Sequence, residues 1–305
     1  MQDFVIIEVG STNTKAYLCN DNEVLDLGFK TIEFKNHYKK NKEIVEEDKK
    51  ELYSFINNIT NENIYVFGTS IFRNLTQNQR DAWLKEFKEH TNLDFRIVTS
   101  SEENEFTVYG AVSNVEYDGN IAVMIGGGGS TELSIVRNGG IIESCNSSFG
   151  AMDVSDNYPD LRSDIATTPY DKMVEETKTL VNKPKNKADI LILAGGDYIY
   201  FYEELNYPVT NNQFYDNPLQ PYSLDVATMD KLDRDFFYNK SLDEICIRTN
   251  NEGWWRGARG MRICVKALVD ILDVKYIVPT RISMVYGIVE AIKSGKLLGV
   301  KNFCR

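Results

Sequence analysis

The sequence predicts an α/β protein built from two similar domains, and three observations support this fold class. The chain has 305 residues, which is enough for two domains of ordinary size. Residues 121–135, IAVMIGGGGSTELSI, have the pattern of an apolar strand, a loop with four glycines and a second strand. The same order of strand, Gly/Ser/Thr-rich loop and strand opens the chain at residues 4–18. A repeated supersecondary unit of this kind indicates two domains of one architecture.

The four glycines of the loop contribute nothing to a hydrophobic core. Glycine permits positive φ and a close approach of the backbone to a ligand, and successive free N–H groups form an anion-binding concavity. A flexible hairpin turn is the alternative, although a hairpin needs only two turn residues. We therefore favour a phosphate-binding loop, made by Gly127, Gly128, Gly129, Ser130 and Thr131.

The first domain is predicted to begin with antiparallel strands at residues 4–9, 16–18 and 23–34. The turn after the first strand is rich in small polar residues, and we interpret it as a second phosphate-binding turn, made by Gly10, Ser11, Thr12 and Asn13. Two ordinary hairpins, similar by coincidence, are the alternative. Apolar spacing then predicts helices at residues 49–58, 78–90 and 101–112, with strands at 64–67 and 94–98.

A third anion-binding candidate follows the strand at residues 64–67. Ser70 is expected to cap a helix that carries Arg73 in its first turn. A cation fits better at a helix C-terminus, so this arginine calls for an explanation. An anion held by Thr69, Ser70, Arg73 and the helix N-terminus is one interpretation, and a surface ion pair of Arg73 is the other.

The polar segment 113–120 is the predicted domain boundary, because the second meander starts directly after it. The third strand of that meander is expected at residues 140–147. An apolar strand at residues 190–193 ends in Gly195 and Gly196, and such strand ends line ligand crevices in open α/β folds. Further elements are predicted as a long loop at 206–222, a last strand ending at residue 278, and helices at 171–181, 224–237, 258–272 and 284–292.

Composition excludes several classes of protein. The net charge is −11 and the longest basic run is HYKKNK at residues 37–42, which argues against duplex nucleic acid as a partner. We expect that run to lie in a solvated loop. The five cysteines are scattered and contain no CxxC pair, so neither a zinc site nor a disulfide framework is indicated. The first ten residues, MQDFVIIEVG, have the pattern of a strand rather than of a signal peptide. No apolar run is long enough to span a bilayer. We expect a cytoplasmic protein without a membrane partner.

The chain resembles the exopolyphosphatase/guanosine pentaphosphate phosphohydrolase family over nearly its whole length. Five segments match in order and spacing: FVIIEVGSTNTKAYL at 4–18, FGTSIFRN at 67–74, VTSSEENEFTVYGAV at 98–112, MIGGGGSTEL at 124–133 and SSFGAM at 147–152. GGGSTEL after an apolar strand is the specific signal among them. That family shares the fold of actin, hexokinase and chaperone ATPases. The resemblance therefore implies two actin-like (ribonuclease H-like) domains that flank a central cleft. From the repeated strand–loop–strand pattern we further expect the two glycine turns to face each other across that cleft.

Within that fold we assign residues 1–115 to the N-terminal domain and residues 116–282 to the C-terminal domain. The C-terminal helix, in residues 283–305, is expected to return to the first domain. The resemblance also implies hydrolysis of a terminal phosphoanhydride, in inorganic polyphosphate or in a guanosine tetra- or pentaphosphate. The sequence does not choose between these substrates, and it leaves the oligomeric state open, a homodimer included.

The resemblance further implies Mg²⁺ and a glutamate that activates water. Glu103 is our candidate for that glutamate, and Arg73 would neutralise charge on the leaving group. Glu8, which stands where the family has aspartate, and Glu132 would hold Mg²⁺ or its waters.

Three departures from the family pattern bear on activity. Ile125 replaces an aspartate, and isoleucine cannot coordinate Mg²⁺. An ungapped match places Asn104 at the position of the catalytic glutamate, and an amide cannot take a proton from water, which leaves Glu103 and Glu105 as alternatives. The family's Arg–Glu pair is also missing around residues 282–287. The losses at Ile125 and Asn104 favour a second hypothesis, a weakly active or non-hydrolytic sensor of polyphosphate or nucleotide, since fold does not fix function. A kinase of the same superfold is a third.

Overall fold

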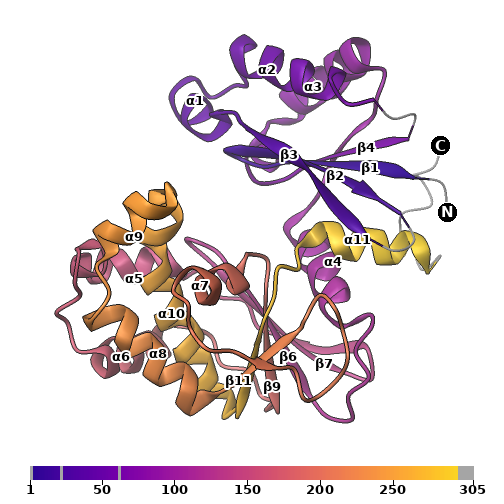
Figure 1. Cartoon of the computed structure of the whole chain (residues 1–305). Helices are drawn as coiled ribbons and strands as arrows, with labels where there is room; N and C mark the ends of the chain where they lie inside the picture. Colours follow the sequence, from indigo (N-terminus) through magenta and orange to yellow (C-terminus); the bar gives the residue numbers. More distant parts are fainter. Residues whose placement is uncertain (1–2, 21–22, 61–62, 295–305) are drawn as a thin grey trace. The chain divides into compact units, whose positions relative to one another are not determined.

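The computed structural model describes residues 3–20, 23–60 and 63–294 (Figure 1). Contacts divide the chain into two units, Met1–Phe106 with Val285–Arg305 and Thr107–Met284. The division falls inside helix α4 (Ser100–Val112), whereas the boundary expected from sequence lies in the polar segment after it. The part of the expected C-terminal helix beyond residue 294 lies outside the described residues.

The first unit contains a five-stranded sheet in the order β3-β2-β1-β4-β5. Strands β1, β2 and β3 form an antiparallel meander, and β4 and β5 continue the sheet in parallel with β1. The meander agrees with the sequence prediction. The bounds are β1 Phe4–Val9, β2 Asn13–Cys19, β3 Val24–Thr31, β4 Ile64–Gly68 and β5 Phe95–Ile97.

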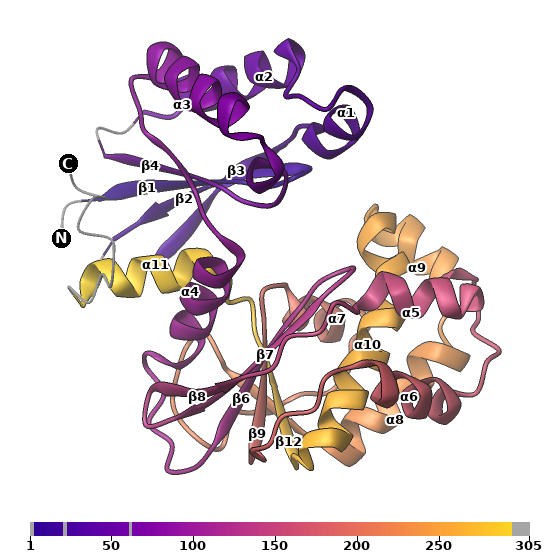
Figure 2. The ribbon, with the colours of Figure 1, turned by 180° about the vertical axis from the view of Figure 1, so that it is seen from behind.

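Helices cover both faces of this sheet. Figure 2 shows α2 and α3 on one face and α11 on the other. A Cβ on Gly287 would lie 1.7 Å from the carbonyl oxygen of Phe106, so only glycine allows α11 to pack this closely on α4. The bounds are α1 Phe34–Asn41, α2 Glu46–Asn57, α3 Gln77–Thr91 and α11 Met284–Lys293.

Two local predictions for this unit are wrong. The basic run at residues 37–42 belongs mostly to α1 rather than to a loop, because Phe34 at the start of α1 is buried and anchors the helix. Ser70 does not cap an α-helix. It is the first residue of a five-residue 3₁₀ helix, η1 (Ser70–Asn74), and no side chain caps that helix.

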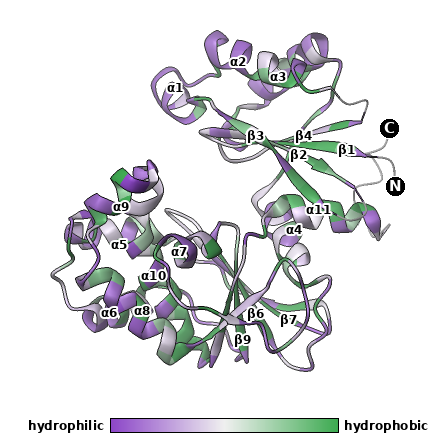
Figure 3. Ribbon diagram, viewed as in Figure 1, coloured by the Kyte–Doolittle hydropathy of each residue, from purple (hydrophilic) through white to green (hydrophobic). Residues whose placement is uncertain are grey.

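The second unit contains a seven-stranded sheet in the order β10-β11-β12-β9-β6-β7-β8. Strands β6, β7 and β8 form the predicted second meander, and β9 and β12 continue it in parallel with β6. The central strands β1, β6 and β9 of the two sheets are predominantly apolar (Figure 3). The bounds are β6 Ile121–Gly126, β7 Thr131–Arg137, β8 Gly140–Ser144, β9 Ile190–Ala194, β10 Thr210–Asn211, β11 Tyr222–Asp225 and β12 Tyr276–Pro279.

Helix α10 (Glu252–Leu272) is the central helix of this unit, with Trp255 and Leu272 fully buried. A Cβ on Gly260 would lie 2.2 Å from the carbonyl oxygen of Ala151, so glycine lets α10 contact α5 closely. Helices α7 and α9 were not predicted. The other bounds are α5 Ala151–Asn157, η2 Pro159–Arg162, α6 Tyr170–Leu180, α7 Tyr198–Glu204, α8 Val226–Tyr238 and α9 Leu242–Thr249.

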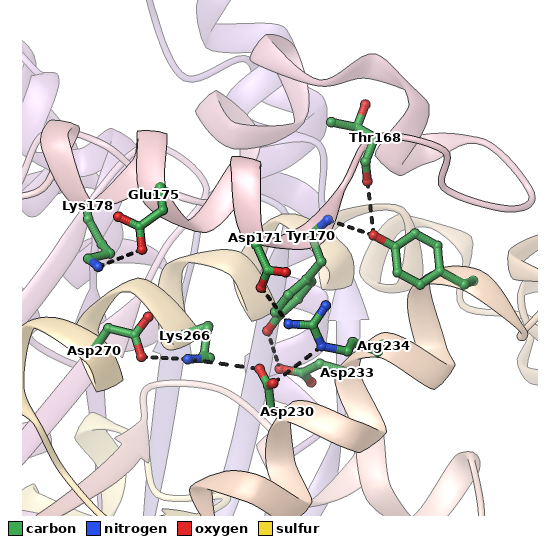
Figure 4. A network of polar contacts seen from close by, with 11 residues as sticks. Thr168, Tyr170, Asp171, Glu175, Lys178, Asp230, Asp233, Arg234, Lys266 and Asp270 are labelled. Atoms are coloured by element: carbon green, nitrogen blue, oxygen red, sulfur yellow. Dashed lines mark hydrogen bonds and ion pairs between the residues drawn. The ribbon is translucent and has the colours of Figure 1, made fainter.

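A buried ion pair fixes α10 against its neighbours. Arg262 Nε donates to Asp233 Oδ1 at 2.6 Å, and the Tyr170 hydroxyl donates to Asp233 Oδ2 at 2.9 Å. Figure 4 shows Tyr170 and Asp233 within the surrounding polar network. Burial raises the pKa of Asp233, while Arg262 and Tyr170 oppose that shift. Removing one partner of such a pair leaves an uncompensated buried charge, so the network holds α6, α8 and α10 in one arrangement.

Candidate functional site

The first glycine turn of the chain is tight. Gly10 N–H donates to the carbonyl of Asn13 at 2.9 Å, and a Cβ on Gly10 would lie 2.9 Å from that same oxygen. Thr12 accepts from the amide of Ile32 through its carbonyl. The turn is therefore held at both ends, and a larger residue at Gly10 would open it.

Two of the predicted phosphate-binding segments contact each other in the first unit. Ser11 Oγ donates to Ser70 Oγ at 2.6 Å, and Thr69 N–H donates to the carbonyl of Val9 at 3.0 Å. These contacts join the carboxyl ends of the parallel strands β1 and β4, the edge where open α/β sheets bind ligands. Ser70 has φ +52°, which a non-glycine residue adopts at an energetic cost.

The two residues assigned catalytic roles pair with each other. Arg73 Nη1 donates to Glu103 Oε2 at 2.6 Å and to the carbonyl of Val98 at 3.3 Å. Helix η1 places the arginine, and the first turn of α4 places the glutamate. Arg73 thus forms the ion pair that one interpretation expects, and its partner is the candidate water-activating residue.

Glu8 lies at the end of β1, opposite Lys15 of β2. Burial raises the pKa of Glu8, the charge of Lys15 lowers it, and the charge of Glu103 raises it. The negative charge of Glu103 therefore disfavours ionisation of Glu8.

The donor set of the first unit agrees with Mg²⁺ held together with phosphate. Within the described ranges no three His, Cys, Asp or Glu side chains gather as a metal cluster. Magnesium commonly uses one or two carboxylates plus substrate phosphates and water rather than an all-protein cage. In the first unit Glu8 supplies one such carboxylate.

The residues around Glu103 have separate tasks. Glu102 accepts from the amide of Thr99 at 2.9 Å and pairs with Arg96 at 2.6 Å, so it caps α4. Burial would raise the pKa of Glu102, but the hydrogen bonds from Thr99 and Arg96 lower it overall. Asn104 Oδ1 is buried and has no donor in the part of the chain that the structure describes. Glu105 is exposed and accepts from Ser101 Oγ at 3.1 Å.

The glycine loop of the second unit is attached to helix α5. The carbonyls of Gly127 and Gly128 accept from the amides of Ala151 at 3.0 Å and Met152 at 2.7 Å. A Cβ on Gly150 would lie 2.5 Å from the carbonyl oxygen of Gly127. A loop held by backbone contacts of this kind is not a flexible hairpin.

Some donors of this loop are used within the protein and others are not. Gly127 N–H donates to the carbonyl of Ser130 at 2.9 Å. Thr131 donates through its amide to Ser147 and through its hydroxyl to Phe149, at 2.9 and 2.8 Å. Among the described residues, no acceptor meets the amides of Gly128, Gly129 and Ser130. These three amides are the donors that the loop keeps available for the predicted anion.

The contacts of Gly195, in the turn after β9, serve the packing of the protein rather than the binding of a ligand. Gly195 has φ +81° and donates its amide to the carbonyl of Ile282 at 2.7 Å. A Cβ on Gly195 would lie 2.5 Å from Cγ2 of Ile125, so this glycine accommodates the isoleucine. Ile125 is half-buried and lies opposite Glu132 in the β6–β7 register.

A pocket of about 220 Å³ brings together two glycine segments of the second unit. The loop contributes Gly126, Gly127 and Gly128, and the turn after β9 contributes Gly196. Sequence reasoning missed the remaining walls, which α5, α7 and α10 supply through Met152, Tyr198, Phe201, Trp254, Gly257 and Met261. The helical glycine Gly257 was the available signal, because glycine inside a helix costs about 1 kcal/mol and marks a place where a side chain is not wanted.

Comparison with known proteins gives matches for both sequence and fold. The sequence profile of the Ppx/GppA phosphatase family matches residues 29–213, while no curated protein matches the chain. The crystal structure of the type II variant of the Aquifex aeolicus Ppx/GppA phosphatase is similar with a TM-score of 0.73 at 13% identity, over 95% of this chain and 99% of that chain. An exopolyphosphatase from Cytophaga hutchinsonii is similar with a TM-score of 0.69 at 14% identity, over 96% of this chain and 98% of that chain.

These similarities confirm the predicted fold class, two actin-like α/β domains that each open with an antiparallel meander. Among the helices that the structure describes, none combines the length and the apolarity that crossing a lipid bilayer requires.

Proposed function

Because the chain belongs to the Ppx/GppA phosphatase family, we propose that it hydrolyses the terminal phosphoanhydride of inorganic polyphosphate or of a guanosine penta- or tetraphosphate. The observation that carries this proposal is the contact of Arg73 with Glu103 at 2.6 Å, in the same unit as Glu8 and the Ser11–Ser70 contact. A carboxylate, a guanidinium and hydroxyl donors are the groups that phosphoanhydride hydrolysis needs.

Phosphoryl transfer depends mainly on positioning and on stabilising charge at the transferred group. In the first unit, the turn at Gly10 and the hydroxyls of Ser11 and Ser70 would bind phosphate oxygens. In the second unit, the amides of Gly128 and Gly129 would do the same. Bound Mg²⁺ would supply further neutralisation of the phosphate oxygens. In the first unit Glu8 is the residue proposed to hold it or its waters, and in the second unit Glu132 is the residue proposed for that role.

The reaction adds water across the terminal bond. The water oxygen forms a bond to the terminal phosphorus as the bond from phosphorus to the bridging oxygen breaks. Glu103 takes a proton from the water, and the guanidinium of Arg73 both orients Glu103 and stabilises negative charge on the bridging oxygen. Positioned proton transfer of this kind contributes about 10²- to 10⁴-fold to rate.

A second candidate is a weakly active or non-hydrolytic sensor of polyphosphate or nucleotide on the same scaffold. The observation that favours it is Asn104, which stands at the position expected for the catalytic glutamate and carries a buried oxygen without a donor among the described residues. Ile125, in place of an aspartate, would weaken the Mg²⁺ site. A sensor would bind these ligands without releasing phosphate.

Phosphate release from polyphosphate, guanosine pentaphosphate and ATP, measured in parallel, tests the proposal. Wild type should release phosphate from at least one of the first two, and Glu103→Gln should reduce the rate about 10²-fold or more. Glu105→Gln is the matched control and should leave the rate within a few-fold. Ligand binding without phosphate release by wild type would establish the sensor instead.

A further inference from the structure

We propose that His37 of α1 is a positioning residue for the turn at residues 10–13, and that it acts on this turn through its contact with Asp48 of α2. The inference rests on the proposed function, because that function assigns phosphate to the turn. Helices α1 and α2 and the turn all belong to the first unit.

The turn is held by the segment that leads into α1. The carbonyl of Thr12 accepts from the amide of Ile32 at 2.8 Å, and the carbonyl of Ser11 accepts from the amide of Lys35, also at 2.8 Å. Lys35 is the second residue of α1. The hydroxyl of Ser11 is one of the groups proposed to bind phosphate, so the position of α1 decides where that hydroxyl lies.

Helix α1 also contacts the segment that carries Arg73. The ring of Phe34 meets the ring of Phe72 edge-on, with centroids 5.3 Å apart. The hydroxyl of Tyr38 donates to the carbonyl of Asn74 at 2.8 Å. Phe72 and Asn74 flank Arg73 in η1, so a shift of α1 acts on the arginine as well as on the turn.

The position of α1 depends on contacts made by its polar side chains. It has eight residues, and isolated helices shorter than about 12–15 residues are marginal in water. All eight are described by the structure, and Phe34 alone among them is buried. The others are polar and include the lysines at positions 35, 39 and 40. One apolar anchor leaves the far end of the helix to be fixed by polar contacts.

The contact that joins α1 to α2 is made by a buried carboxylate. His37 Nδ1 donates to Asp48 Oδ1 at 2.8 Å. Asp48 is buried, and its second oxygen, Oδ2, has no hydrogen-bond partner in the part of the chain that the structure describes. Removing the partner of a buried charge leaves that charge uncompensated. The pair therefore resists separation, and it holds α1 against α2.

The pair depends on pH. The hydrogen bond to Asp48 raises the pKa of His37 above its ordinary value of 6.5, although desolvation opposes that shift. Burial raises the pKa of Asp48, and His37 opposes this shift. Arg73, the charged residue of η1, pairs with Glu103 instead. The other charged groups that act on the pair are carboxylates of α2 and of the residue before α1, namely Glu33, Glu47 and Glu51.

The sign of the pH effect follows from these shifts. The pairing of His37 is fully present below its unfolded pKa of about 6.5 and is lost as pH rises through the raised folded pKa. On the acid side it ends where Asp48 takes up a proton. The turn should therefore be held more firmly at pH 6 than at pH 9.

Calorimetric titration of the full chain with inorganic tripolyphosphate at pH 6 and pH 9 tests the proposal. At pH 6, His37→Gln should bind at least about fivefold more weakly than wild type, the lower end of ordinary coupling between sites. At pH 9 the two proteins should bind alike. The ionisation of the probe is the same for both, so the ratio of affinities isolates His37.

The matched control is His90→Gln, because the chain has two histidines. It should bind as wild type at both pH values. Equal affinities of His37→Gln and wild type at pH 6, or a loss of the same size at pH 9, would overturn the proposal.

A second pair of variants separates positioning from a direct attraction between the imidazolium and phosphate. Asp48→Asn and Glu47→Gln each remove one negative charge from the first turn of α2. If His37 attracted phosphate directly, both variants would strengthen binding at pH 6. Positioning predicts that Asp48→Asn weakens binding, because α1 is released, and that Glu47→Gln does not weaken it. Tighter binding by Asp48→Asn would refute the proposal.

Hydrogen exchange gives an answer without a ligand. The amides of Ile32 and Lys35 donate to the turn, and at pH 6 they should exchange at least about fivefold faster in His37→Gln than in wild type. His90→Gln should exchange as wild type. Unchanged protection in His37→Gln would contradict the proposal. Failure of the proposed function has a different signature, namely no binding of tripolyphosphate by wild type while these amides still respond to His37→Gln.

Discussion

Arg73 and Glu103 form one ion pair, with Nη1 and Oε2 separated by 2.6 Å. The arginine follows β4 and the glutamate belongs to the first turn of α4, so the contact connects two strand ends of the same sheet. Both side chains remain partly exposed, at 26% and 36%, so a phosphate could reach them. Arg73 is thus placed to meet a substrate anion while it stays paired with Glu103. The predictions below follow from this pair and from its neighbours.

Arg73→Ala should weaken polyphosphate or nucleotide binding without unfolding the protein. Losing a charge-assisted contact costs about 1.5–3 kcal/mol, or roughly 10- to 150-fold in affinity. A partly exposed ion pair contributes only about 0–1 kcal/mol to stability, so the melting temperature should change little. Lys88→Ala, which removes the surface pair with Asp94 at 3.1 Å, is the control. Unchanged affinity at low salt would leave Arg73 as a structural ion pair only.

Glu8→Gln should stabilise the protein at neutral pH while reducing Mg²⁺-dependent phosphate release. The folded-state pKa of Glu8 is raised above its ordinary value of 4.5, chiefly by burial. The stability associated with the protonated form is therefore fully present below about pH 4.5 and is lost as pH rises through the folded pKa. Glutamine does not ionise and escapes that loss. Urea melts between pH 4 and pH 8 should show a difference that grows with pH, and equal stabilities at pH 8 would contradict the assignment.

Asn104→Glu should increase phosphate release if position 104 faces the reacting water. Its Oδ1 is buried without a donor among the described residues, and a carboxylate there could accept a proton where the amide cannot. A gain of about tenfold or more is expected, against the 10²–10⁴-fold that a positioned base can contribute. Asn104→Gln has the same length without the charge and should give no gain. Equal rates for the two variants would show that position 104 plays no part in proton transfer.

Gly150→Ala should displace the glycine loop of the second unit. The added methyl group would lie 2.5 Å from the carbonyl oxygen of Gly127 and 2.7 Å from the amide of Ser130, and backbone atoms yield poorly. Overpacking of this kind costs about 1–3 kcal/mol, and we expect weaker ligand binding with a lower melting temperature. In Gly140→Ala the nearest atom is 3.7 Å away, so this control should keep both properties. Normal binding by Gly150→Ala would show that the loop geometry is not needed.

Local patterns in the sequence were sufficient to predict the two antiparallel meanders. Apolar runs separated by Gly/Ser/Thr-rich turns specify strand, turn and strand within about fifteen residues, because both strand propensity and turn chemistry act locally. The same locality explains two errors. The lysines of residues 37–42 concealed a short helix that is anchored by buried Phe34, and the hydroxyl of Ser70 suggested a helix cap where the chain instead forms a 3₁₀ turn at positive φ.

The sequence by itself therefore determined the fold class, the two glycine turns and the residue types available for phosphate chemistry. Tertiary structure alone decided which of them meet. Arg73 reaches Glu103 because β1, β4 and β5 lie side by side in parallel. The pocket exists because Gly128, Gly196 and Gly257, far apart in the chain, converge where α10 packs closely on α5 through Gly260. The spacing of apolar residues indicates which face of a helix or strand is buried. It does not indicate which residue lies across the contact, because strand order and the distance between packed helices decide that.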